Sequence, residues 1–111
     1  MTAPTIPTLT LNDGATQPAI GFGTYLLNGS VGVGDMVSAI TVGYRLLDSA
    51  FNYENEGAVG EAIRQAGVPR EHLRVTSKLP GRHQHFKEAI ATIEESLYRA
   101  QLAYYDQYLI H

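Results

Sequence analysis

Residues 43–63 read GYRLLDSAFNYENEGAVGEAI, and this stretch contains the features that decide the fold. Its apolar residues Leu46 and Leu47 predict a strand that ends at a carboxylate, Asp48. A polar loop then carries Tyr53, and Glu56 opens an amphipathic helix. Reactive groups at the carboxyl end of a strand, followed directly by a helix, are typical of an active-site βα unit.

Predicted strands and helices alternate on both sides of this unit. After a Pro-punctuated tail over residues 1–7, the sequence predicts a β-hairpin at 8–18 and single strands at 19–24, 45–48, 73–78 and 106–111. Helices are predicted at 35–42, after a glycine-rich approach at 30–34, and at 56–65 and 86–102. This alternation with short links predicts an α/β fold with a parallel sheet and right-handed crossovers.

The apolar residues of the predicted helices recur at helical spacing and are expected to face the core. The expected faces are Met36, Val37, Ile40 and Thr41; Val59, Ala62 and Ile63; and Ile90, Ile93, Leu97 and Ala100. The acidic residues Glu54, Glu56, Glu94 and Glu95 are interpreted as solvated helix faces or capping charges.

Three of the predicted strands end at a polar residue that could take part in catalysis. Asp48, Lys78 and His111 close successive strands, and Tyr53 lies in the loop after the first of them. The spacing between them matches the length of one βα unit, so we expect all four groups at one rim of the sheet. A carboxylate, a phenol, an ammonium and an imidazole in one pocket would make a proton-transfer site.

A proton-transfer role for Tyr53 needs help from its neighbours. A free phenol has a pKa of about 10 and exchanges protons poorly at neutral pH, but a nearby ammonium stabilises the phenolate. Lys78 could supply that ammonium, and Asp48 could hold it in place. His111 could donate a hydrogen bond to a bound carbonyl, to which Tyr53 would deliver a proton.

Residues 43–63 resemble the long signature of the aldo-keto reductases, and every fixed position of that pattern is filled. Residues 75–79 resemble the family's lysine strand, and residues 105–111 resemble its D-L-Y-L-I-H strand. The resemblance implies that Asp48, Tyr53, Lys78 and His111 are the catalytic tetrad. It also implies a (β/α)₈ TIM barrel, of which this chain would supply the hairpin and the N-terminal half over residues 8–111.

Residues 21–25 resemble the family's first-strand G-x-G-T-W segment. The resemblance implies that Gly23, Thr24 and Tyr25, together with Asp48, contact the cofactor NADP(H). It further implies reduction of aldehydes or ketones, keto-sugars among them, with Tyr53 as the general acid and without a metal. The short front of the chain is similar to the bacterial diketogluconate-reductase-type members.

Two other motifs were weighed against this interpretation. His83-Gln84-His85, with His72 earlier, could suggest a metal site, but the motif lacks a nearby carboxylate or cysteine set. The glycine-rich segment 29–34 before a helix could cradle a phosphate, but it lacks the glycine order and the lysine of known phosphate loops. We therefore interpret these histidines as surface residues and segment 29–34 as the segment that leads into the helix.

Composition narrows the class of protein and of partner. The 111 residues are 44% hydrophobic, with a formal net charge of −3 and no cysteine. A chain of this size and composition forms one globular domain, and its slight negative charge does not favour binding to nucleic acid or to an anionic membrane. The absence of cysteine fits a reducing compartment. The first residues lack the basic and apolar segments of a signal peptide. We expect a soluble, cytoplasmic protein with a small carbonyl compound as its partner.

Three hypotheses of function remain open from the sequence. The intact protein could be a monomeric NADPH-dependent reductase, of which these residues are the front part, since the chain stops on an apolar strand without a polar tail. The 111-residue piece could instead be an inactive half barrel that self-associates through its open sheet edge. A third hypothesis is a binding subunit on the same scaffold, as with the potassium-channel partner subunits of the family.

Overall fold

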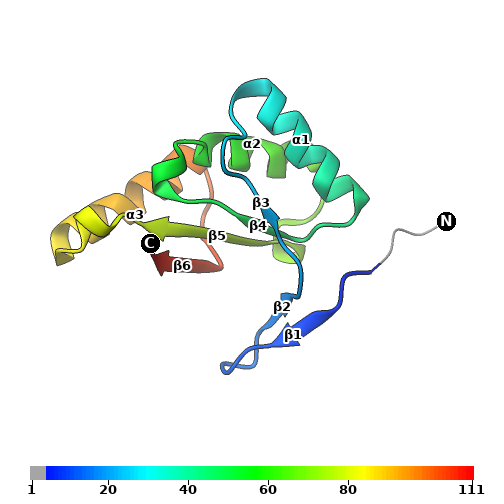
Figure 1. Ribbon diagram of the computed structural model, residues 1–111, viewed down its shortest axis with the longest axis horizontal. Helices are drawn as coiled ribbons and strands as arrows, with labels where there is room; N and C mark the ends of the chain where they lie inside the picture. The colour runs from blue at the N-terminus through cyan, green and yellow to red at the C-terminus, as the bar shows by residue number, and fades with distance from the viewer. Residues whose placement is uncertain (1–4) are drawn as a thin grey trace.

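The structure is a computed structural model that describes residues 5–111. A short antiparallel hairpin comes first, formed by β1 (Thr8–Thr10) and β2 (Thr16–Pro18). Its turn contains Gly14, whose φ of 88° lies in the left-handed region that glycine tolerates. The hairpin lies below the main sheet in the view of Figure 1, away from the helices. The predicted hairpin is thus confirmed within its expected bounds.

The main sheet has four parallel strands whose spatial order follows the chain. These strands are β3 (Phe22–Gly23), β4 (Leu46–Asp48), β5 (Arg74–Leu79) and β6 (Gln107–Ile110). Leu47 of β4 pairs with Phe22 on one side and with Val75 on the other. All four strands run in the same direction, so their carboxyl ends meet at one edge. This confirms the expected α/β fold of a partial barrel preceded by a hairpin.

Three helices connect the strands and cover the sheet. They are α1 (Gly29–Val42), α2 (Glu56–Ala66) and α3 (Phe86–Ala100). Short 3₁₀ turns lie in the loops at η1 (Phe51–Tyr53), η2 (Arg70–His72) and η3 (Gly81–His83). Helix α2 packs against α1 on one side and against α3 on the other (Figure 1). None of the helices within residues 5–111 is long and apolar enough to cross a membrane.

Helix α1 begins earlier than the sequence predicted. The glycine-rich segment 30–34 was expected to precede the helix, but it is itself helical. The backbone N–H of Gly32 donates to the carbonyl of Asn28 at 2.9 Å. A Cβ on Gly32 would overlap the backbone of Leu27, so glycine permits this close start. The expected core position Thr41 is also wrong, because Thr41 is exposed and Ala39 is buried in its place.

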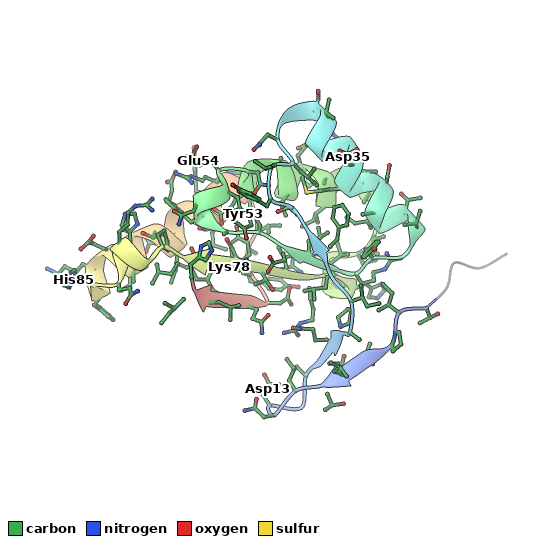
Figure 2. All side chains as sticks on the ribbon, viewed as in Figure 1. Asp13, Asp35, Tyr53, Glu54, Lys78 and His85 are labelled. Atoms are coloured by element: carbon green, nitrogen blue, oxygen red, sulfur yellow. The ribbon has the colours of Figure 1, made fainter. Side chains whose placement is uncertain are left out.

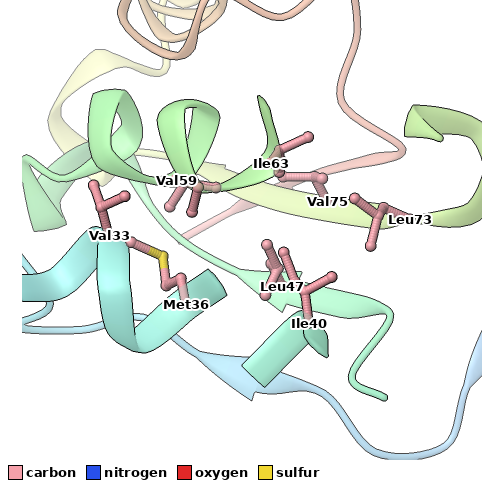
Figure 3. Close-up of a cluster of buried hydrophobic side chains, with 9 residues drawn as sticks. Val33, Met36, Ile40, Leu47, Val59, Ile63, Leu73 and Val75 are labelled. Atoms are coloured by element: carbon pink, nitrogen blue, oxygen red, sulfur yellow. The ribbon is translucent and has the colours of Figure 1, made fainter. Parts of the chain in front are cut away.

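The apolar core lies between the sheet and helices α1 and α2. Leu47 and Val75 come from the centre of the sheet, while Met36 and Ile40 of α1 and Val59 and Ile63 of α2 cover them (Figure 3). Leu47, Val75, Met36 and Ile40 are completely buried. Burial of each such side chain contributes about 1.5–3 kcal/mol, so this cluster fixes α1 and α2 on β4 and β5.

Helix α3 does not bury the stripe that its sequence predicted. Of the expected face, only Ala100 is fully buried, and Ile90 is 43% exposed. The buried residues of α3 are Thr92, Ser96 and Ala100. Helix α3 instead meets its neighbours through small and polar side chains: Thr92 hydrogen-bonds to His83, Ser96 hydrogen-bonds to Glu56, and Ala100 stands against Gly60 of α2.

Candidate active site

Strand β4 delivers Asp48 to the carboxyl edge of the sheet, and β5 delivers Lys78 beside it. The Lys78 ammonium donates to the Asp48 carboxylate at 2.9 Å and to the backbone carbonyl of Ser49 at 2.9 Å. The Lys78 side chain is 14% exposed and that of Asp48 is 41% exposed. A half-buried ion pair with a second, backbone acceptor fixes the position of the ammonium group.

Tyr53 lies at the end of η1, directly over this ion pair. Its hydroxyl is 3.4 Å from the Lys78 Nζ, and its ring centroid is 5.0 Å from the same atom. Figure 2 shows Tyr53 and Lys78 at the same end of the sheet. Glu54 follows in the left-handed region with a φ of 56° and ends the 3₁₀ turn. The short turn thus places the phenol of the partly buried Tyr53 beside the Lys78 ammonium at the sheet edge.

His111 follows β6 at the same edge. Its backbone N–H donates to the carbonyl of Leu79 at 2.9 Å, which extends the pairing of β5 and β6 by one step. Its ring meets the Tyr53 ring edge to face, with centroids 6.0 Å apart. The structure therefore brings Asp48, Tyr53, Lys78 and His111 together, and their catalytic roles remain a proposal.

The four residues expected at the cofactor occupy different environments. Tyr25 is 63% exposed, and its ring centroid lies 5.0 Å from that of Tyr53. Gly23 has open space where a Cβ would stand. Thr24 is completely buried, and its hydroxyl donates to the backbone carbonyl of Asp48 at 2.9 Å. Thr24 thus braces β3 against β4, while Tyr25 and Gly23 face the open side.

A buried amide, Asn55, lies beneath the candidate site and was not singled out by the sequence reasoning. It is 3% exposed. Its Nδ2 donates to the carbonyls of Thr24 and Leu27, and its Oδ1 accepts from the Ser49 hydroxyl at 2.8 Å. Asn55 therefore connects the loop after β3 to the loop after β4.

Glu56 corrects the expectation of a solvated carboxylate. It is 1% exposed and accepts hydrogen bonds from the hydroxyls of Ser77, Ser96 and Tyr105. The Nη1 of Arg99 lies 4.0 Å from the Oε1 of Glu56. Burial, followed by the neighbouring Glu56 charge, raises the pKa of Tyr105 well above its usual range. Glu56 thus ties the start of α2 to β5 and α3.

A signal for these two residues was present in the sequence. Asn55 and Glu56 fill fixed positions of the signature, directly after the turn that carries Tyr53. Fixed polar positions at a helix start indicate either a capping role or buried hydrogen bonding. No side-chain cap is formed at Asn55, so the structure assigns it to buried hydrogen bonding.

The loop after β5 contains His83 and His85, two of the three histidines considered as metal ligands, whereas His72 lies before β5 in η2. His83 packs edge to face on Phe51 and hydrogen-bonds through Nδ1 to the Thr92 hydroxyl at 2.9 Å. The same hydroxyl donates to the carbonyl of Glu88, so the His83 Nδ1 is the donor. Across residues 5–111, His, Cys, Asp and Glu side chains form no group of three with metal-site geometry.

Known proteins resemble this chain over most of its length. The model of the Aldo/keto reductase family matches residues 19–111. The 2,5-diketo-D-gluconic acid reductase B of Corynebacterium sp. (strain SHS752001) is 52% identical over 108 residues, which cover 97% of this chain and 39% of that protein. The chain spans about two fifths of the length of the curated relatives it matches.

Solved structures agree with the sequence comparison. The crystal structure of an aldo/keto reductase from Brucella melitensis matches with a TM-score of 0.91 and 35% identity, over 96% of this chain and 41% of that one. The crystal structure of Bombyx mori aldo-keto reductase in complex with NADP matches with a TM-score of 0.89 and 36% identity, over 98% and 39% of the two chains.

Proposed function

Because the chain belongs to the aldo/keto reductase family, we propose that the protein containing it reduces aldehydes or ketones to alcohols with NADPH. One observation carries the proposal. The Lys78 ammonium lies between the Asp48 carboxylate, at 2.9 Å, and the Tyr53 hydroxyl, at 3.4 Å, at the edge where His111 also lies. A phenol beside a fixed ammonium is suited to moving a proton to or from a substrate oxygen.

The residues of this chain divide the work of the proposed reaction. Tyr53 donates its proton to the carbonyl oxygen, and in the reverse direction its phenolate removes the proton from the alcohol. Lys78 stabilises the negative charge that this transfer leaves on the phenol, and Asp48 keeps the ammonium in place. His111 donates a hydrogen bond to the substrate oxygen and orients it towards Tyr53.

The surroundings of Tyr53 fit the nicotinamide end of the cofactor. The Tyr25 ring is 63% exposed and stands beside Tyr53, so it offers a flat aromatic face for stacking. Gly23, the last residue of β3, has open space where a Cβ would stand. NADPH bound there would supply the hydride to the carbonyl carbon. The complex of the Bombyx mori relative with NADP supports the choice of this cofactor.

Replacement of Tyr53 by phenylalanine tests the proposal directly. Tyr53→Phe removes the acid and preserves the ring contacts, so we expect turnover to fall by roughly 10²- to 10⁴-fold while NADPH binding is retained. The assay follows NADPH oxidation with a panel of aldehydes and keto-sugars. Tyr98→Phe, at a position that is 72% exposed, is the matched control and should keep full activity. Unchanged turnover in Tyr53→Phe would overturn the assignment.

A second candidate concerns the 111 residues acting by themselves. Phe86 on α3 is 79% exposed and Ile110 on β6 is 73% exposed, which favours association of the open flank. In this case the chain would be catalytically silent and would pair with a complementary half. The intact mass of the purified protein separates the candidates, since these residues weigh 12.1 kDa and a whole barrel of about 250 residues weighs roughly twice as much or more.

A further inference from the structure

We propose that Asn55 is a positioning residue whose buried amide sets the places of Tyr25 and Lys78 relative to Tyr53. The effect on turnover rests on the proposed reductase function, whereas the effect on the geometry of Tyr53 does not. Asn55 is the last residue before α2, two positions after Tyr53, and is 3% exposed. Its amide uses both donor hydrogens and its oxygen within the protein.

The nitrogen of the amide holds the loop that carries Tyr25. Nδ2 donates to the carbonyl of Thr24 at 2.5 Å and to that of Leu27 at 3.2 Å, which are the residues on either side of Tyr25 and Leu26. Leu26 has a φ of 69°, in the left-handed region that branched side chains rarely adopt. Such a conformation persists only where the surroundings enforce it, and Asn55 fixes the backbone on both sides.

Apolar packing anchors this loop at one end only, where Leu27 contacts the core cluster. Tyr25 is 63% exposed and Leu26 is 71% exposed, so neither side chain is anchored by burial in the core. The other contacts that the loop makes include short-range turn bonds, the pairing of Thr24 with Asp48 and the contact between the Tyr25 and Tyr53 rings. Between Thr24 and Leu27 no side chain is buried, so the hydrogen bonds from Asn55 to the backbone on both sides help to set the position of the Tyr25 ring against Tyr53.

The oxygen of the amide acts on the Lys78 side. Its Oδ1 accepts from the hydroxyl of Ser49, which is completely buried, at 2.8 Å. The backbone carbonyl of the same Ser49 accepts from the Lys78 ammonium at 2.9 Å. A shift of Ser49 would move one of the two acceptors that locate Lys78. One side chain thus connects two of the groups that contact Tyr53.

The neighbouring hydrogen-bond network of Glu56 is a purely structural one, and it provides a comparison for Asn55. Glu56 is as deeply buried as Asn55, but it accepts hydrogen bonds from Ser77 on β5, Ser96 on α3 and Tyr105 after α3, none of which lies in the Tyr25 loop. Ser96 is completely buried and hydrogen-bonds to Glu56 and Tyr108. Ser96→Ala therefore removes buried hydrogen bonds without touching the loops around Tyr53, and it serves as the matched control.

The kinetic test compares Asn55→Ala, Ser49→Ala and Ser96→Ala in the purified protein. We expect Asn55→Ala to lower kcat by about 10- to 100-fold, since small misplacements of reacting groups have effects of that size, with the carbonyl KM changed far less. Ser49→Ala removes only the hydrogen bond on the Lys78 side of Asn55, so its kcat should fall less. Ser96→Ala should lower the melting temperature without lowering kcat. An equal fall of kcat in Ser96→Ala would overturn the proposal.

A spectroscopic readout works without any assumption about the reaction. Protein labelled with ¹³Cζ-tyrosine gives a Tyr53 phenol resonance, which the Tyr53→Phe variant identifies. We expect this resonance to move in Asn55→Ala and to stay in place in Ser96→Ala. A shift in a protein that reduces no carbonyl compound would leave the positioning role standing and remove the proposed function. A folded Asn55→Ala variant, or a folded Ser49→Ala variant, with unchanged kcat and an unmoved Tyr53 resonance would overturn the positioning role.

Discussion

Helices α2 and α3 both have an apolar stripe at helical spacing, yet they bury it to different extents. Val59, Ala62 and Ile63 of α2 are all at most 5% exposed. On α3 the stripe residue Ile90 is 43% exposed, and the residues that the helix buries are Thr92, Ser96 and Ala100. The same kind of pattern thus gives an apolar core contact in one helix and a small, polar seam in the other.

The neighbours of each helix explain the difference. Helix α2 lies between α1 and α3 and above the core of β4 and β5, so its stripe has partners on every side. Helix α3 contacts α2, β5 and η3, and Ile90 of its stripe stays 43% exposed. An apolar stripe therefore predicts which side of a helix can be buried, while the neighbouring elements decide whether it is.

The sharpest test of this comparison makes the same substitution in both helices. Ile63→Ala deletes a side chain that is 5% exposed in the core, so we expect the free energy of unfolding to fall by about 2–5 kcal/mol. Ile90→Ala, at 43% exposure, should lower it by less than about 1 kcal/mol. Urea unfolding of both variants measures the difference. Equal losses would show that the Ile90 side of α3 is packed in solution.

A second test addresses the seam between α2 and α3. A Cβ on Gly60 would overlap the carbonyl oxygen of Ala100, so Gly60→Ala must push the two helices apart. We expect it to lower the free energy of unfolding by about 1–3 kcal/mol. Gly34→Ala in α1, where a Cβ meets nothing within 4 Å, should instead raise it by roughly 0.5–1 kcal/mol. Thermal unfolding that shows stabilisation by both changes would mean that the seam is loose.

The smallest expected effect is a dependence of the same seam on alkaline pH. Burial and the Glu56 carboxylate raise the pKa of Tyr105 in the folded protein above the value of about 10 that it has when unfolded. The folded state therefore keeps a proton that the unfolded chain loses, so stability is full below pH 10 and falls as the pH rises above it.

Urea unfolding between pH 9 and pH 11, roughly centred on that unfolded value, measures the alkaline slope. Tyr105→Phe should make the slope shallower, whereas Tyr98→Phe on the exposed side of α3 should leave it unchanged. An identical slope in the wild-type protein and in Tyr105→Phe would contradict the contribution of the seam.

The order of elements could be predicted from sequence because periodicity and turn residues are local. The hairpin, the parallel strands and the three helices all follow from residues close together in the chain. The start of α1 could not, since the helical state of Gly32 depends on how closely it approaches Leu27. The burial of Ile90 could not either, because burial is a property of the neighbours of a helix.

In the candidate site, too, some residues could be predicted from the sequence and others could not. Asp48, Lys78 and His111 could be expected together because each stands at the end of a parallel strand, and parallel strands end at one edge. Glu56 was interpreted as a solvated or a capping charge, and the solvated alternative is wrong, because its burial needs hydroxyls from Ser77, Ser96 and Tyr105, which lie far along the chain. The hydrogen bonds of Asn55 to Thr24 and Leu27 also join residues that are far apart in the chain, so the sequence did not predict them.

The strand order β3-β4-β5-β6 has a consequence for how the chain is made. Each strand pairs with the strand that precedes it in the sequence, so during synthesis every new strand finds its partner already outside the ribosome. N-terminal segments can fold before later ones are made, and low sequence separation between partners speeds that step. Within residues 5–111 the growing edge of the sheet is then always the youngest strand, and β6 adds to a β5 that is already made.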